Sequence, residues 1–251
     1  MKAPVKWKSA AARRLSAQAG GLSIDKAIPA IVANLIGDHE CPPTDLEYIC
    51  SKLNVALIED DDIPVVGELR RVGKHFVIVC ARGQSHERRR FTIAHELAHA
   101  LLESIGARSP RSSDETERLC EMIAAEILMP KAVFRTALGE EPMTGAAISG
   151  LARQFHASLT ATAIRCTEFR LVSIVDIQNG QWRWMKGPVR PARHQVESLV
   201  RQKAGDEDGD GLIFVEFNGS TQAFNGEWLR FTPERSGLLV LTPHDLQRVS
   251  P

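Results

Sequence analysis

The stretch His95-Glu96-Leu97-Ala98-His99 is the strongest chemical signal in the sequence. Residues four positions apart lie on one face of an α-helix, so His95 and His99 can hold a single Zn²⁺ between two imidazoles. Glu96 lies further around the helix, where its carboxylate can reach a water molecule beside the metal. The motif predicts two metal ligands and a general base. The alternative is a buried helix with two hydrogen-bonded core histidines.

A third metal ligand is expected from the next helix, over residues 114–128. That segment carries four glutamates, namely Glu115, Glu117, Glu121 and Glu126. Glu117 and Glu121 share one face with small residues, which lets this face approach another helix closely. A carboxylate on such a face needs a compensating charge, and Zn²⁺ provides one. We predict Glu117 as the ligand and Glu121 as the acceptor of a hydrogen bond from a ligand imidazole, with Glu121 as the alternative ligand.

Apolar spacing and turn signals predict a chain that is helical in its middle and mixed at its carboxy end. We expect helices over residues 28–36, 45–53, 88–105, 114–128, 146–155, 159–169 and 195–203, and strands over 55–58, 64–72, 75–80, 171–178, 181–186, 212–217, 228–231 and 238–241. The apolar period changes near residue 170, so the predicted fold class is α+β. The predicted parts are a basic lead-in, frayed or helical (1–25), a domain that holds the motif and a helical segment 146–169 (26–170), and a small α+β domain (171–251).

Two stretches of the chain resemble the ImmA/IrrE family of zinc metallopeptidases. They are Arg90-Phe91-Thr92-Ile93-Ala94-His95-Glu96-Leu97-Ala98-His99-Ala100-Leu101-Leu102 and Glu117-Arg118-Leu119-Cys120-Glu121-Met122-Ile123-Ala124-Ala125-Glu126-Ile127-Leu128-Met129-Pro130. The similarity extends from about residue 28 to residue 169. It implies a gluzincin-like zinc peptidase domain with a small sheet, in which segment 146–169 is helix-turn-helix-like. The family has Asn or Asp where this chain has Glu121.

The resemblance implies a zinc endopeptidase that cleaves a helix-turn-helix repressor and thereby derepresses genes. Two other functions stay open. One is a metal-stabilised regulator without proteolytic activity, and the other is a DNA-binding regulator that uses segment 146–169. A recognition helix normally presents Arg, Lys, Asn or Gln to base edges, and helix 159–169 offers only Arg165. Direct nucleic-acid binding is therefore the less favoured interpretation.

Composition excludes several classes of protein. The 31 basic and 31 acidic residues balance, so no bulk charge favours nucleic acid or an anionic membrane as the partner. The run Arg88-Arg89-Arg90 is expected to pair with acids or stay solvated. No apolar run reaches the roughly 18 residues of a membrane-spanning helix, and the basic amino terminus lacks the apolar core of a secretory signal. The five cysteines form no C-x-x-C pair, which is typical of reduced thiols in a cytoplasmic protein.

The sequence leaves one catalytic role unassigned, that of the side chain that would stabilise an oxyanion. Tyr48, His75, His86 and His156 are equal candidates for it. The edge of the hairpin over residues 64–80 is expected to bind an extended substrate by strand addition, as open sheet edges do.

Overall fold

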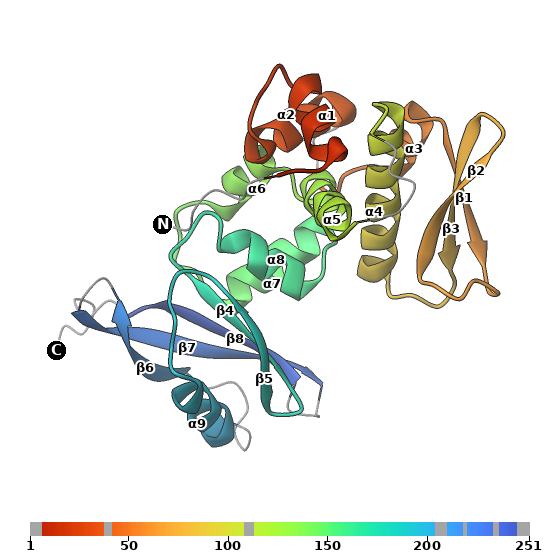
Figure 1. Cartoon of the computed structure of the whole chain (residues 1–251). Helices are drawn as coiled ribbons and strands as arrows, with labels where there is room; N and C mark the ends of the chain where they lie inside the picture. The colour runs from red at the N-terminus through yellow and green to blue at the C-terminus, as the bar shows by residue number, and fades with distance from the viewer. Residues whose placement is uncertain are drawn as a thin grey trace. The chain divides into compact units, whose positions relative to one another are not determined.

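The computed structural model describes residues 7–37, 42–107, 113–203, 210–217, 220–232 and 236–244 (Figure 1). Its contacts divide the chain into two compact units. The first unit comprises Met1–Ala137 and Gln154–Ser158, and the second comprises Leu138–Arg153 and Leu159–Pro251. Both contain helices and a sheet, so the predicted mixed α+β class is confirmed.

The first unit is built from six helices and three strands among the residues that the structure describes. They are α1 (Ala10–Gln18), α2 (Ile24–Ile36), α3 (Leu46–Lys52), β1 (Val55–Asp60), β2 (Gly67–Val72), β3 (His75–Ala81), α4 (His86–Ser104), α5 (Asp114–Leu128) and α6 (Lys131–Leu138). The predicted helices over 28–36, 45–53, 88–105 and 114–128 correspond to α2, α3, α4 and α5. No helix in the described part of the chain has the length and apolar character needed to cross a membrane.

The small sheet has the order β1-β3-β2, with β1 parallel and β2 antiparallel to β3. The central strand carries the fully buried residues Ile78, Val79 and Cys80. β2 forms one edge and lies against α4. A Cβ at Gly67 would come within 2.2 Å of the Thr92 methyl group, so glycine is what permits this close approach. β2 begins at Gly67 rather than at the predicted Pro64.

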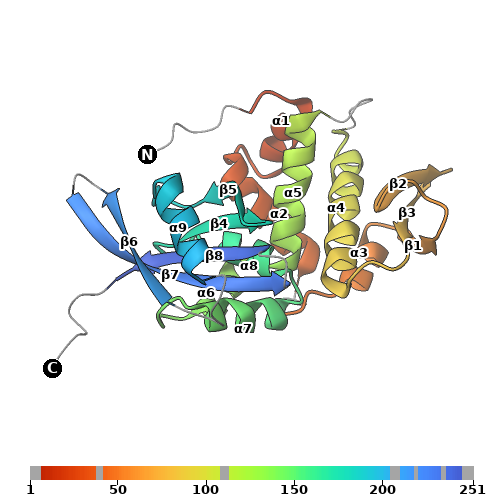
Figure 2. The ribbon, with the colours of Figure 1, turned by 90° about the horizontal axis from the view of Figure 1, so that it is seen from below.

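Helices α4 and α5 lie side by side in the first unit (Figure 2). The Ser85 hydroxyl caps α4 and the Ser113 hydroxyl caps α5, each accepting a hydrogen bond from a backbone N–H in the first turn. Cys120 and Ala124 of α5 are fully buried, and their small side chains allow the two helices to pack closely. This pair of helices brings residues from separate parts of the sequence to one place.

The segment predicted as a frayed or helical lead-in (1–25) contains the helix α1 and lies in the first unit, as far as the structure describes it. Ala11, Ala12 and Leu15 of α1 are buried, and α1 packs against α2 and α5. The Glu115 carboxylate accepts hydrogen bonds from the backbone N–H groups of Lys8 and Ser9. An apolar face of alanine and leucine thus makes this segment part of the first unit. Residues 1–6 lie outside the described residues, as does Cys41.

The second unit contains the helices α7 (Gly145–Phe155, whose last two residues pack with the first unit), α8 (Leu159–Cys166) and α9 (Arg193–Lys203). Its strands are β4 (Ser173–Gln178), β5 (Gln181–Lys186), β6 (Asp210–Phe217), β7 (Ser220–Thr232) and β8 (Ser236–Pro243). They form an antiparallel sheet in the order β5-β4-β8-β7-β6. Phe224 and Trp228 belong to its core, together with Val196 and Leu199 of α9. Phe214 and Phe231, in contrast, are exposed.

The division into units differs from the boundary expected near residue 170. The reason lies at the start of α7, where the Gly145 N–H donates a 2.6 Å hydrogen bond to the Glu227 carboxylate of β7. The Arg170 guanidinium also donates to Glu140. These long-range contacts attach residues 138–153 to the carboxy-terminal sheet, and local sequence periodicity carries no information about them. The two helices of segment 146–169 are present as α7 and α8.

Candidate active site

Four side chains of the first unit converge where α4 passes α5. His95, Glu96 and His99 come from two successive turns of α4, and Glu117 comes from the start of α5. His95 Nε2 lies 3.2 Å from one Glu117 carboxylate oxygen, and His99 Nε2 lies 3.6 Å from the other. Ligand atoms of His95, His99 and Glu117 all lie within 4.8 Å of one another. The structure therefore brings together the three residues that the sequence predicts as metal ligands.

The donor set fits a catalytic zinc ion. Two imidazole nitrogens and one carboxylate oxygen are a set found at catalytic zinc sites, where three protein ligands leave a fourth position open. Burial lowers the pKa of His99, which favours the neutral imidazole that a metal binds. Glu117 is about 40% exposed at its side chain, so the ligand face of the cluster is open to solvent. No other group of three such side chains is found in the ranges that the structure describes.

Glu96 lies beside this cluster in a different environment. Its side chain is 8% exposed, and burial together with the neighbouring Glu117 carboxylate raises the pKa of Glu96 to about 7. The nearby backbone N–H of Leu69 in β2 stabilises the charged carboxylate and opposes this shift. The edge strand β2 thus lies beside Glu96 in the same cleft.

An open cleft of about 570 Å³ contains the cluster. Val65, Val66, Leu69 and Phe91 give it an apolar side. The charged side chains at its surface, beyond the four already described, are Glu68, Arg88 and Glu103. The cleft is large enough to admit a short stretch of extended polypeptide.

Arg88 is a cleft residue that the sequence interpretation missed. Of the three consecutive arginines, Arg89 pairs with Glu59 at 2.7 Å, and Arg90 donates to the Thr44 carbonyl. Arg88 instead faces the cleft. The sequence spacing could have predicted this position for Arg88. Residues three or four positions apart share one face of α4, and that face carries Arg88, Thr92, His95, His99 and Glu103.

The structure does not place Glu121 in its predicted role. Its side chain is exposed and forms no hydrogen bond with either ligand imidazole. The buried Nδ1 of His95 has no hydrogen-bond partner. Glu121 also lies outside the three-residue cluster, so the alternative in which it replaces Glu117 has no geometric support. One helical turn separates the two glutamates, and the crossing of α4 and α5 favours the first.

None of the four candidate oxyanion donors lines the cleft. His75 is hydrogen-bonded to Asn54 at the far end of β3. His86 and His156 contact each other instead.

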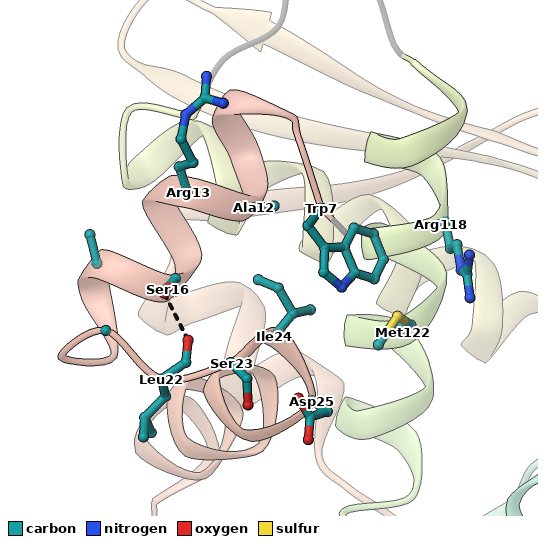
Figure 3. A pocket seen from close by; sticks show the side chains of 12 residues that line it. Trp7, Ala12, Arg13, Ser16, Leu22, Ser23, Ile24, Asp25, Arg118 and Met122 are labelled. Atoms are coloured by element: carbon teal, nitrogen blue, oxygen red, sulfur yellow. Dashed lines mark hydrogen bonds between the residues drawn. The ribbon is translucent and has the colours of Figure 1, made fainter. Parts of the chain in front are cut away.

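A larger cavity of about 900 Å³ lies elsewhere in the first unit, between α1, α2 and α5 (Figure 3). Trp7, Ile24 and Met122 face it, and the Ser16 hydroxyl donates to the Leu22 carbonyl at its edge. Among the described residues it contains no cluster of metal ligands. Size alone therefore does not mark the reactive site, and the smaller cleft on α4 is the candidate.

Residues 50–167 match the Peptidase_M78 family model, described as the IrrE N-terminal-like domain. This segment belongs to the ImmA/IrrE family. The ImmA/IrrE segment includes all of β1, β2, β3, α4 and α5, and hence every residue of the cluster and of the cleft.

Two curated relatives carry the name radiation response metalloprotease IrrE. The one from Deinococcus radiodurans is 31% identical over 162 residues, which cover 59% of this chain and 45% of the relative. The one from Deinococcus deserti is 34% identical over 104 residues, which cover 38% of this chain and 37% of the relative. Each match thus spans less than half of the relative.

A solved structure titled Mycobacterium tuberculosis transcriptional regulator has a similar fold. It aligns with a TM-score of 0.55 and 14% identity, covering 92% of this chain and 79% of that chain. The alignment therefore extends well beyond the ImmA/IrrE segment. At this identity it concerns the fold alone.

Proposed function

We propose that this chain is a zinc-dependent endopeptidase that hydrolyses a peptide bond in a protein substrate. The observation that carries the proposal is the position of Glu96, an acid–base group beside a two-histidine, one-glutamate cluster in an open cleft. A zinc ion that only stabilises structure needs no such group next to it. The membership of residues 50–167 in a family whose relatives are named metalloproteases supports the same conclusion.

The reaction divides between the metal and the protein. Zinc, when held by His95, His99 and Glu117, supplies Lewis acidity that polarises a carbonyl and makes water a stronger acid. Glu96 accepts the proton of the attacking water and delivers it to the amine nitrogen as the C–N bond breaks. The nearby Leu69 N–H stabilises the charged form of Glu96, which is the form that accepts a proton.

The edge of β2 offers a binding surface for an extended substrate. The Ala81 N–H donates to the Val66 carbonyl, so in an antiparallel pair the alternate residues Gly67, Leu69 and Arg71 point their backbone groups away from β3. Gly67 and Leu69 line the cleft. A substrate strand that pairs with the remaining free backbone groups of this edge, with the Leu69 N–H left to Glu96, would lie across the cleft.

We further propose a helix-turn-helix repressor as the substrate, and derepression of genes as the result. This part of the proposal rests on the resemblance to ImmA/IrrE peptidases. The competing function is a metal-stabilised regulator that cleaves nothing. The two differ in one measurable property, namely whether Glu96 is needed for a chemical step.

The deciding experiment compares Glu96→Gln with wild type on purified repressors encoded near the gene for this chain. We expect Glu96→Gln to retain zinc and fold but to lose cleavage by at least about 100-fold, the lower end of the range for general acid–base contributions. Glu121→Gln, the same change at an exposed site on α5, is the control and should cleave at the wild-type rate. Equal cleavage by Glu96→Gln and wild type would refute the assigned base, and no cleavage by wild type would favour the regulator.

A further inference from the structure

A second pair of histidines lies close together in the first unit, away from the candidate active site. His86 is the first residue of α4, and His156 lies in the turn between α7 and α8. Their ring centroids are 5.1 Å apart with an interplanar angle of 68°. Neither histidine lines the cleft around His95 and His99. The pair therefore joins two chain segments that are distant in sequence.

The geometry of this pair matches that of the predicted ligands. The rings of His95 and His99 have centroids 5.0 Å apart and an interplanar angle of 70°. Two imidazoles bound at about 2.0–2.1 Å to one tetrahedral metal ion have centroids about 5.2 Å apart, because each centroid lies about 3.2 Å from the metal. Both pairs meet this condition.

Both histidines of the second pair are accessible to a ligand. Both imidazoles are exposed, and neither forms a hydrogen bond within the described part of the chain. Glu87 is nearby. Hydrogen bonds from its own backbone N–H and from Ser85 hold the pKa of Glu87 below its usual value. His156 adopts a positive φ of 49°, a conformation uncommon for a residue with a side chain.

We propose that His86 and His156 form a second metal site, which binds a divalent transition-metal ion such as Zn²⁺ through two imidazole nitrogens. Water fills the remaining coordination positions, because Glu87 does not join the pair in a three-ligand cluster. Its carboxylate contributes negative charge beside the ion. With two protein ligands, this site binds zinc more weakly than the cluster of His95, His99 and Glu117. A bound ion ties the start of α4 to the turn after α7.

Titration of the full chain with Zn²⁺ alone tests the proposal by calorimetry. Wild type should bind two equivalents, one tightly and one weakly. His86→Gln and His156→Asn should each lose the weak equivalent and keep the tight one. Asparagine is chosen at 156 because it tolerates a positive φ while lacking the imidazole. His194→Gln, at an exposed position at the start of α9, is the matched control and should keep both equivalents.

A complementary variant separates the two sites. His99→Ala should lose the tight equivalent and retain the weak one, which shows that the second site does not depend on the first. A single equivalent in wild type, or two equivalents in both His86→Gln and His156→Asn, would overturn the proposal. Circular dichroism of each variant checks the fold. His86→Gln, at an exposed first helical residue, carries the test by itself if His156→Asn fails to fold.

Discussion

Glu117 is the residue on which the candidate metal centre depends most, because it alone comes from a different helix. The helical repeat of α4 places the two histidines next to each other. The position of the carboxylate depends instead on how α5 packs against α4. Its two oxygens face both imidazole nitrogens. Losing this charge leaves two neutral ligands, which bind Zn²⁺ far less well.

We therefore expect Glu117→Gln to weaken zinc binding by more than about 100-fold, beyond the 10–100-fold effect of removing a residue that only supports a ligand. Glu121→Gln should leave zinc affinity unchanged. Competition with a chromophoric chelator measures both. If Glu121→Gln lost zinc affinity and Glu117→Gln kept it, Glu121 would be the ligand and the geometry of the cluster would be contradicted.

Asp176 is a buried carboxyl in β4 and has no part in the metal centre. It is 4% exposed, and burial raises its pKa, against the opposing charge of Arg183 and a hydrogen bond from Gln178. Between its ordinary pKa and this raised value, the folded chain holds a proton that the unfolded chain has released. The stability contributed by this group therefore falls as the pH rises through that window.

Asp176→Asn should abolish this fall of stability with rising pH, because the amide has a similar shape and no charge. We expect the variant to be more stable than wild type at pH 7 by about 1 kcal/mol, the usual scale of single polar changes. The difference should shrink toward pH 4. Denaturant unfolding at several pH values measures it, with Asp62→Asn at an exposed position as the control. A free energy of unfolding that changes with pH in the same way for Asp176→Asn and wild type would contradict the expectation.

At the scale of elements, the contact between β2 and α4 controls the shape of the cleft. Thr92 donates to the Gln84 side chain, and Gln84 donates to the carbonyls of Val66 and Ala81 at the start of β2 and the end of β3. Gly67 then packs directly on the Thr92 methyl. The position of the edge strand thus depends on the absence of a side chain at one residue.

Gly67→Ala should push β2 away from α4, because the new methyl would overlap the Thr92 methyl. Overpacking of this kind costs about 1–3 kcal/mol, and we expect peptidase activity to fall as the Leu69 N–H moves from Glu96. Thr92→Ser keeps the hydroxyl and removes the methyl, so the double variant should recover most of the lost stability and activity. Thermal unfolding and cleavage assays test this. No recovery in the double variant would show that the clash is not the cause.

The elements differ in how far the sequence predicts them. The helices α4 and α5 are predicted to within two residues of their ends, because their apolar faces repeat with the helical period. The strand β7 is predicted only over 228–231 but spans Ser220–Thr232. Its first half contains polar residues and Asn225-Gly226, which read as a turn. That half is extended because it pairs with β6 on one side and β8 on the other.

The candidate site divides in the same way. His95, Glu96 and His99 follow from spacing within one helix, and Arg88 could have been found from the same spacing. The choice of Glu117 over Glu121 depends on how two helices cross, and the contact of Leu69 with Glu96 depends on where a strand lies. Both are properties of tertiary packing, to which a pattern within one segment gives little access.

At the scale of the whole molecule, the chain passes between its two units more than once. Residues 138–153 pack with the carboxy-terminal sheet, residues 154–158 with the first unit, and the remainder with the second. The hydrogen bond from the Gly145 N–H to Glu227 anchors the first turn of α7 within the second unit. A carboxylate at a helix N-terminus is favourable because it also interacts with the helix dipole.

Glu227→Ala should destabilise the second unit by about 1–2 kcal/mol, the range for loss of a helix cap. Hydrogen exchange should show faster exchange in α7. Zinc binding should not change, because the cluster lies in the first unit. Glu141→Ala, at an exposed site before α7, is the control. Loss of zinc in Glu227→Ala would show that the two units are energetically coupled.

The hydrogen bonds from the Lys8 and Ser9 backbone to Glu115 have a practical consequence for making this protein. Glu115 precedes the proposed ligand Glu117 by two residues in the first turn of α5. A preparation trimmed to begin inside α1 loses this anchor and frees the turn that presents the ligand. Such a sample can give a normal circular dichroism spectrum while binding less zinc. Metal content, rather than secondary structure, is therefore the measure by which shortened or tagged versions should be accepted.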